Sequence, residues 1–90
     1  MNFELREDGY YVPDENGETV GVINWEYNEE GDMVITHTIV SDKLRGMGAG
    51  MKLLNKAVEY AKENNLKIVP VCSFAVKRIT EIEGAEALLR

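Results

Sequence analysis

Residues 33–61 read MVITHTIVSDKLRGMGAGMKLLNKAVEYA: a strand-like run, a glycine-rich loop and a helix-like run, in that order. The first part, 33–40, is rich in β-branched residues, which predicts a strand. From Met47 to residue 61 the apolar side chains recur in steps of four and three, the spacing of one helical face. A short apolar run follows at 68–71. This order predicts a β-α-β unit with parallel strands and a right-handed crossover.

The first 40 residues show short strand-like runs separated by turn signals. Asn16-Gly17 is a strong hairpin signal, and residues 19–27 after it are rich in β-branched and aromatic side chains. Shorter strands are predicted near 3–6 and 10–12, and the second of these stops at Pro13. The aromatic residues of these runs are expected on the faces of the sheet rather than in a binding site: Tyr10, Tyr11, Trp25 and Tyr27.

These elements together predict a mixed α/β (α+β) fold in a single domain over residues 1–90. Its sheet is mostly antiparallel, one main helix packs on it, and the β-α-β crossover adds one parallel strand. A short C-terminal helix is expected from Ser73 to Ile79, and residues 85–90 are expected to add a last helical turn. The composition, with 44% apolar and 29% charged residues, is that of an ordinary globular domain.

Charge is distributed unevenly along the chain. The formal net charge is −6, which disfavours a phosphate backbone, so no nucleic-acid partner is expected. Residues 1–32 hold ten acidic side chains and one basic one, Arg6, whereas residues 33–90 hold nine basic and six acidic ones. The first part would attract cations and the second would tolerate an anion. A solvated acidic surface is the alternative explanation of the same pattern.

Composition also bears on membrane, metal and compartment. No apolar run of about 20 residues is present, so a membrane-spanning helix is not expected. The charged residues 1–8 do not resemble a signal peptide. Cys72 is the only cysteine, which leaves no intrachain disulfide and no group of thiols for a metal ion. The sequence predicts a cytoplasmic protein without a metal site.

The loop at 42–51 carries three glycines at alternate positions where a helix is expected to begin. Glycine inside a helix costs roughly 1 kcal/mol relative to alanine, so these glycines need a physical reason. One reason is the close approach of a diphosphate to the unpaired N–H groups of the first helical turn. Another is tight packing of the strand against the helix. Basic side chains near the loop favour the anion: Lys43, Arg45, Lys52 and Lys56.

Two phosphate-binding motifs do not fit the loop. The dinucleotide motif G-x-G-x-x-G would need a glycine in place of Met51, and the P-loop motif would need Gly-Lys-Ser/Thr. The pattern Arg45-x-x-Gly48-x-Gly50 instead resembles the R/Q-x-x-G-x-G/A motif of the GNAT-type N-acetyltransferases. In that family the loop holds the pyrophosphate of acetyl-coenzyme A.

The resemblance extends to a small, single-domain GNAT-like subfamily with chains of about this length. It is carried by His37-Thr38-x-Val40, Leu44-Arg45-Gly46-x-Gly48 and Val69-Pro70-Val71-Cys72-x-Phe74. The chain departs from the subfamily at Ser41, where proline is usual, and at 80–84, where a His-Pro-Glu-Tyr-like stretch is usual. The resemblance implies that the pantetheine arm lies along the strand before the loop. It implies these acetyl-CoA-binding residues: Thr38, Ile39, Val40, Arg45, Gly46, Met47, Gly48, Ala49, Gly50 and Ser73.

Cys72 and His37 are the candidate catalytic residues. Cys72 is expected where the second helix begins, and a helix N-terminus favours the thiolate form of a cysteine. The subfamily carries a proposed catalytic cysteine at this place; a nucleophile, a base, an acid and a small buried hydrophobic residue are the open roles. His37 is the only histidine and a candidate base acting through water. Strand alternation predicts that it shares a face with Ile35 and Ile39, where a core histidine is the alternative.

The function predicted from the sequence is acetyl-CoA-dependent transfer of an acetyl group to a primary amine on a small molecule or a peptide. The acidic N-terminal part would suit a cationic acceptor. Pro70, which has no N–H to donate, is expected to open a slot for the acyl arm between strands 33–40 and 68–71. The alternatives are a coenzyme A-binding module without turnover and a sheet-based interaction protein whose glycines serve packing.

Overall fold

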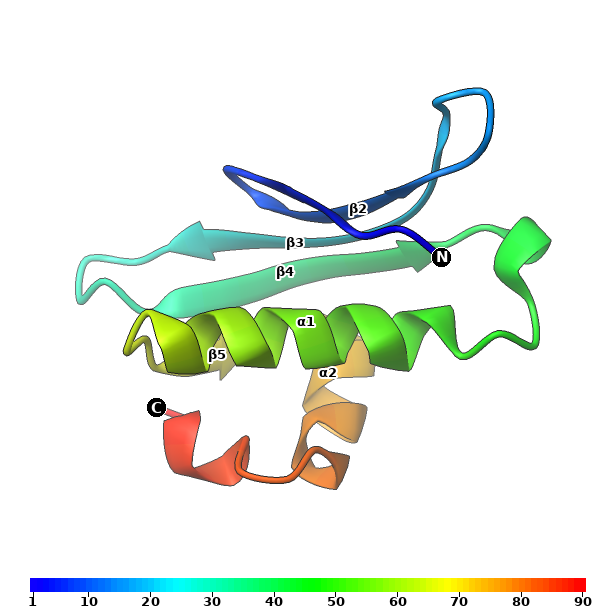
Figure 1. Cartoon of the computed structure of the whole chain (residues 1–90). Helices are drawn as coiled ribbons and strands as arrows, with labels where there is room; N and C mark the ends of the chain where they lie inside the picture. The colour runs from blue at the N-terminus through cyan, green and yellow to red at the C-terminus, as the bar shows by residue number, and fades with distance from the viewer.

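A computed structural model describes all residues from Met1 to Arg90. Five strands form one sheet in the order β1-β2-β3-β4-β5, and α1 connects β4 to β5 (Figure 1). The strands are β1 (Glu4–Arg6), β2 (Gly9–Pro13), β3 (Thr19–Tyr27), β4 (Met33–Val40) and β5 (Ile68–Pro70). The helices are α1 (Ala49–Glu63) and α2 (Ser73–Arg78), with 3-10 turns η1 (Asp42–Leu44), η2 (Ile79–Glu81) and η3 (Glu86–Leu88).

The predicted fold class is confirmed. The first four strands pair antiparallel as a meander, and β4 pairs with β5 in parallel across the α1 crossover. α1 begins at Ala49, two residues later than the start of the apolar pattern at Met47, because Gly48 takes a left-handed conformation with φ of 65°. None of the helices is long and apolar enough to cross a membrane.

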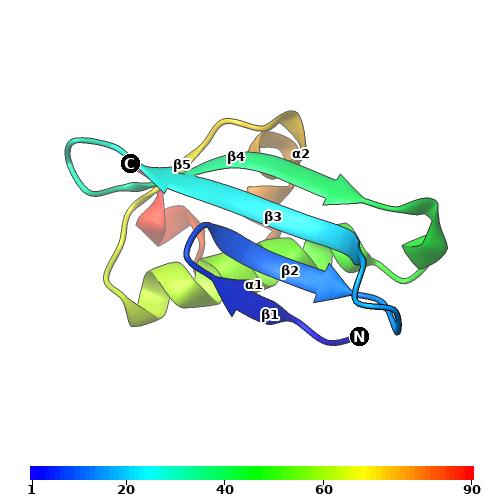
Figure 2. The same cartoon turned by 90° about the horizontal axis from the view of Figure 1, so that it is seen from above.

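All helices lie on one face of the sheet, and the opposite face is uncovered (Figures 1 and 2). On the covered face Ile23, Trp25 and Ile35 are fully buried under the helices. The opposite face, called the open face below, carries Ile39, which is 60% exposed, and the exposed His37. The sheet therefore contributes only one side to the hydrophobic core.

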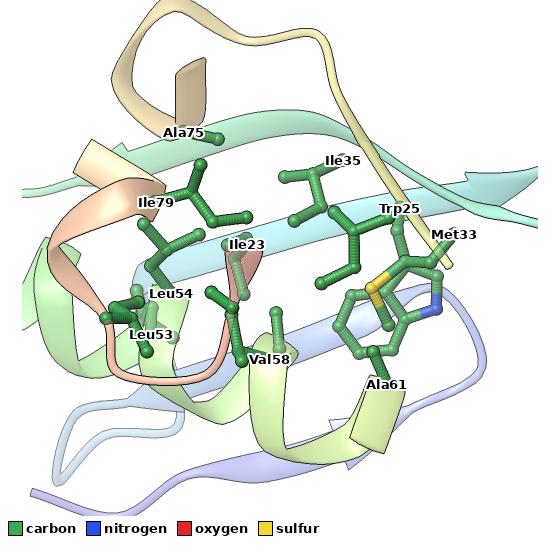
Figure 3. Packing of buried hydrophobic residues seen from close by; sticks show 14 of the residues in the cluster. Ile23, Trp25, Met33, Ile35, Leu53, Leu54, Val58, Ala61, Ala75 and Ile79 are labelled. Carbon is green, nitrogen blue, oxygen red and sulfur yellow. The ribbon is translucent and has the colours of Figure 1, made fainter. Parts of the chain in front are cut away.

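The core joins that side of the sheet to both helices (Figure 3). Ile23 of β3 lies near Val58 of α1, Met33 of β4 lies near Ala61 of α1, and Ile79 lies at the opposite end of the cluster from Met33. Burying each such side chain contributes about 1.5–3 kcal/mol. Trp25 packs between two rings, with its centroid 5.9 Å from that of Tyr10 and 5.1 Å from that of Tyr60. The rings of Tyr10 and Trp25 thus lie on the covered face of the sheet, against the core.

A β-bulge in β4 changes the direction of its side chains. Trp25 of β3 lies opposite Ile35, and its neighbour Asn24 lies opposite His37, so Thr36 is an extra residue without a partner. The bulge reverses the alternation, because the side chains after it point to the face opposite from the one that simple counting gives. The prediction that His37 shares a face with Ile35 is therefore wrong: Ile35 is in the core, and His37 lies on the open face with Ile39.

The C-terminal segment lies along the outer edge of β5. Arg90 donates two hydrogen bonds to the buried carboxylate of Asp32, at 2.6 and 3.0 Å. The backbone N–H of Arg90 donates to the carbonyl of Ile68 on the outer edge of β5. Leu89 forms an isolated parallel β-bridge with the same residue. The hydrogen bonds from Arg90 hold the pKa of Asp32 below its ordinary value. The last helical turn expected at 85–90 is present as η3.

Candidate active site

The glycine-rich loop presents a series of unpaired backbone N–H groups. The first hydrogen bond of α1 runs from the N–H of Lys52 to the carbonyl of Gly48, at 3.0 Å. In the turn before it, Met47 donates to the carbonyl of Leu44 at 3.1 Å. The remaining N–H groups of this segment have no acceptor within the chain: Gly46, Gly48, Ala49, Gly50 and Met51. An anion at this helix N-terminus would be hydrogen-bonded by several of these groups and favoured by the helix dipole.

The three glycines have two different physical reasons. Gly46 and Gly48 have positive φ values of 79° and 65°, and a Cβ atom at either position would meet no neighbour. Their role is to give the loop its conformation, because other residues rarely adopt such φ values. A Cβ atom on Gly50 would instead lie 3.0 Å from the ring of Phe74 in α2. Gly50 is therefore closely packed, but against α2 and not against the strand that the packing alternative named, and its N–H is free as well.

Two basic side chains near the loop take part in surface ion pairs. Arg45 lies 3.0 Å from the carboxylate of Asp42 and its side chain is 80% exposed. Lys43 lies 3.4 Å from Asp14. The pKa of Asp14 is held below its ordinary value, mainly by the backbone N–H of Glu18 and further by that of Asn16. Both cations remain accessible to an anion bound at the loop.

Next to the loop, β4 continues beyond the end of β5 and leaves a free strand edge. The carbonyl of Ile35 accepts from both Val71 and Cys72, after which the chain turns into α2. On the other side of β4, the N–H of Ser41 donates to Val20 of β3. Alternation along the strand then directs the backbone groups of Ile39 to β3 and those of Thr38 and Val40 to the gap beside β5.

The expectation that Pro70 opens the gap between β4 and β5 is wrong. The carbonyl of Lys67 and the N–H of Val71 face β4, whereas the carbonyl of Ile68 accepts from Arg90 on the outer edge. Because backbone direction alternates along a strand, the nitrogen of Pro70 also faces the outer edge. The strands separate because the chain leaves the sheet at Cys72, the N-cap residue of α2.

Cys72 faces this gap from its far side. Its sulfur accepts a hydrogen bond from the N–H of Ala75 at 3.4 Å, and the hydroxyl oxygen of Thr38 lies 3.4 Å from the same sulfur. The thiol is half-buried and free. Ser73, the first residue of α2, is exposed beside it. The structure thus brings together Thr38 and Cys72, two residues that the sequence analysis singled out for different reasons.

His37 is not in contact with Cys72. Its Nδ1 lies 3.0 Å from the hydroxyl of Thr36, and its side chain is exposed on the open face. Thr38, one residue later, points to the covered face and to Cys72. The two candidate catalytic side chains therefore approach the free edge of β4 from opposite faces of the sheet. The contact between Thr38 and Cys72 was not predicted, because the family resemblance implied Thr38 only as a residue that binds acetyl-CoA.

Comparison with known proteins shows the family to which the chain belongs. A family model described as GCN5-related N-acetyl-transferase matches residues 2–86. This chain belongs to the GCN5-related N-acetyltransferase family. The solution structure of a GCN5-like protein from Staphylococcus aureus is similar over 99% of this chain and 87% of that one, with a TM-score of 0.78 and 36% sequence identity. The family resemblance inferred from the loop motif is confirmed.

Two archaeal relatives are longer proteins. An uncharacterized N-acetyltransferase of Methanocaldococcus jannaschii is 42% identical over 69 residues, which cover 70% of this chain and 30% of the relative. One from Archaeoglobus fulgidus is 39% identical over 70 residues, which cover 69% of this chain and 46% of the relative. This chain therefore spans less than half of either relative. An acetyltransferase from Bacillus anthracis, solved in complex with acetyl coenzyme A, shares the fold at a TM-score of 0.60 and 23% identity.

Proposed function

We propose that the chain transfers the acetyl group of acetyl-coenzyme A to a primary amine. One arrangement carries this proposal: the unpaired N–H groups of residues 46 and 48–51 follow the free edge of β4 at Thr38 and Val40, with only the short η1 turn between them. The N–H groups of the loop suit a diphosphate. The free edge of β4 suits an extended chain that contains amide groups, because such a chain can pair with a strand edge. Coenzyme A contains both groups in one molecule.

The loop residues fit the diphosphate part of the ligand. A Cβ atom at Gly46 or Gly48 would meet no protein atom, so their backbones are open to a ligand. Arg45 would exchange its contact with Asp42 for a phosphate oxygen, since a guanidinium binds both in the same geometry. The N–H groups of Ala49 and Gly50 would supply the contacts of the helix N-terminus.

The edge of β4 would position the reacting group. In the transfer, the C–N bond to the amine forms as the thioester C–S bond of acetyl-coenzyme A breaks, the amine loses a proton and the sulfur gains one. The N–H groups of Thr38 and Val40 would bind the arm and polarise the carbonyl where negative charge develops. Positioning of this kind contributes about 7–11 kcal/mol of a reaction barrier at best.

The two candidate catalytic side chains, Cys72 and His37, would transfer the protons or the acyl group from opposite faces of the sheet. Cys72 would act at the sulfur side of the gap, where the hydroxyl of Thr38 and the N–H of Ala75 fix the position of its Sγ. His37 would accept the proton of the amine at Nε2, because its Nδ1 is held by the hydroxyl of Thr36. The acceptor would then approach from the open face.

The deciding experiment is intact-mass measurement of the protein and of a library of primary amines after incubation with acetyl-coenzyme A. Acetylated amines that are not formed with the Cys72→Ala variant support the proposal. A thermal shift with coenzyme A but no acetylated amine would favour the binding module without turnover. No thermal shift and no product would overturn the assignment of the loop.

A further inference from the structure

The open face carries a row of three hydrogen-bonded polar side chains beside His37 that the proposed chemistry does not use: Asp8, Tyr11 and Asn24. The hydroxyl of Tyr11 lies 2.9 and 3.1 Å from the two carboxylate oxygens of Asp8, to which it donates. The side-chain amide of Asn24 donates to the oxygen of Tyr11 at 3.1 Å. Asn24 is in turn the direct cross-strand partner of His37. The row therefore runs from a carboxylate at the β1–β2 turn to the candidate base on β4.

Side-chain contacts place the whole row on one face. Arg6, which shares a cross-strand row with Asn24 and His37, lies with its guanidinium 4.1 Å from the centre of the Tyr11 ring. No helix covers this face (Figure 2). Gly9 lies between Arg6 and Asn24 in the row and has no side chain to interrupt it. An elongated molecule can lie across β2, β3 and β4 from His37 to Asp8.

The charge of this face is unbalanced. Arg6 lies 3.0 Å from Glu4, so these two charges offset each other. Asp8 and Glu26 have no cationic partner within the chain, and Glu26 lies next to the row, two residues from Asn24 on the same strand. A cation placed beyond Asn24 would meet two carboxylates and one positive charge that is already paired.

Near the reacting position the same face is apolar. Ile39 is 60% exposed and follows His37 by two residues, on the same face. Val71, which directly follows β5, is 59% exposed. No carboxylate lies among the β4 residues that face the gap. The face thus offers an apolar surface for the reacting end of an acceptor and negative charge for its distant end.

We propose that the acceptor is an elongated amine with a second positive charge, which lies on the open face with its reacting nitrogen at His37 and its second cation at Asp8 and Glu26. This inference rests on the proposed acetyl transfer. Asp8 lies in the β1–β2 turn, next to the first residue of β2 and two strands away from β4, and neighbouring strands lie about 4.8 Å apart. The two nitrogens should therefore be separated by about 10 Å.

The test compares α,ω-diamines of increasing length with n-alkylamines of the same length as acetyl acceptors. The KM of the diamine should pass through a minimum with length, and Asp8→Asn or Glu26→Gln should raise that minimum about fivefold, the upper range for an exposed ion pair. The KM of the alkylamines should not change in these variants. Glu29→Gln removes one negative charge from the turn after β3 and is the matched control.

Equal KM values for diamines and alkylamines, or equal effects of Asp8→Asn and Glu29→Gln, would overturn the inference. A binding measurement separates this failure from failure of the proposed transfer. Addition of a diamine to the coenzyme A-bound protein should shift the NMR signals of Asn24 and His37, and Glu26→Gln should weaken that binding. If no amine is acetylated but this shift occurs, the transfer fails and the recognition surface stands. If the NMR signals do not shift, the proposed recognition surface is wrong.

Discussion

The hydroxyl oxygen of Thr38 lies 3.4 Å from the sulfur of Cys72, and this contact joins two residues 34 positions apart. It spans the gap where β4 continues and β5 has ended. The backbone of Thr38 faces the same gap, so one residue would contact both the acyl arm and the thiol. The contact gives Cys72 a fixed position that a mobile surface thiol would not have.

Replacement of Cys72 by alanine should abolish most of the turnover and leave coenzyme A binding intact. Binding would depend on backbone groups of the loop and of β4, which the substitution does not touch. Ligand at about a hundred times its Kd should still raise the free energy of unfolding by about 2.7 kcal/mol. Steady-state kinetics and thermal denaturation with and without coenzyme A measure the two effects. Full activity of Cys72→Ala would return this residue to a packing role.

Replacement of Cys72 by serine distinguishes its possible roles. A serine hydroxyl can still pass a proton but is a much weaker nucleophile at neutral pH. Retained activity would indicate proton transfer, whereas loss of activity together with an acetylated wild-type protein would indicate covalent catalysis. The covalent adduct is detected by intact-mass measurement in the absence of amine. Bound coenzyme A should also protect Cys72 from alkylation, because the acyl arm would lie beside it.

Replacement of Thr38 by valine should lower kcat several-fold with little effect on the KM of acetyl-coenzyme A. Valine keeps the β-branched shape and the backbone N–H but removes the hydroxyl that contacts Cys72. Thr38→Ser should restore kcat and the alkylation rate of Cys72, which a purely structural role of the methyl group would not allow. Retained kcat in Thr38→Val together with a loss of kcat in Thr38→Ser would show that packing of the methyl group, and not the hydroxyl, is what matters.

The glycines of the loop should respond differently to substitution. Gly48→Ala should weaken coenzyme A binding, because a left-handed conformation costs a non-glycine residue about 1–2 kcal/mol and its relief would redirect the loop N–H groups. Gly50→Ala should act mainly on stability: the contact of its Cβ with the Phe74 ring costs about 1–3 kcal/mol, and the better helix propensity of alanine offsets about 1 kcal/mol of that cost.

The double variant Gly50→Ala/Phe74→Leu is the control for this distinction. A smaller side chain at Phe74 removes the close contact, so the double variant should be more stable than Gly50→Ala while it keeps coenzyme A affinity. Titration by calorimetry and thermal denaturation give the two quantities. If Gly50→Ala loses affinity and the second substitution does not restore it, Gly50 belongs to the ligand site and not to the packing.

Local sequence signals were sufficient for the elements but not for their long-range relations. The strands at Thr19–Tyr27 and Met33–Val40 have the predicted bounds, because β-branched runs bounded by turn residues are a strong signal. The bulge at Thr36 was not predictable, since an extra residue in a strand has no marker in the sequence. The reason for Gly50 was also inaccessible, because Phe74 lies on another helix.

Arg45→Ala should weaken binding of whole coenzyme A more than binding of a pantetheine fragment without phosphates. The guanidinium is exposed, so the loss should be at most about fivefold, as for other surface ion pairs. Added salt should reduce the difference between wild type and variant. Arg6→Ala, which removes an exposed cation from β1, is the control and should not change either affinity. Equal losses for both ligands would assign Arg45 to loop structure only.

The pair formed by Asp32 and Arg90 should make stability depend on pH in the acid range. Arg90 holds the pKa of Asp32 below its unfolded value of about 3.9, so the folded state favours the charged carboxylate. The stabilisation is then fully present above that unfolded value and disappears as the pH falls through the lower folded pKa. No local sequence pattern predicts this ion pair, because Asp32 and Arg90 are 58 residues apart.

Arg90→Gln should therefore lower Tm at neutral pH, and this difference should shrink as the pH falls below about 3.9. Asp32 is buried whereas Glu81 is about half exposed, so Arg78→Gln, which breaks the pair with Glu81, should have a smaller effect and is the matched control. Thermal denaturation of the three proteins across the acid range measures both differences. A loss in Arg90→Gln that stays constant down to the lowest pH would mean that the effect of Arg90 does not depend on the charge of Asp32. No loss at neutral pH would mean that the backbone pairing at Ile68, which the substitution keeps, holds the C-terminal segment.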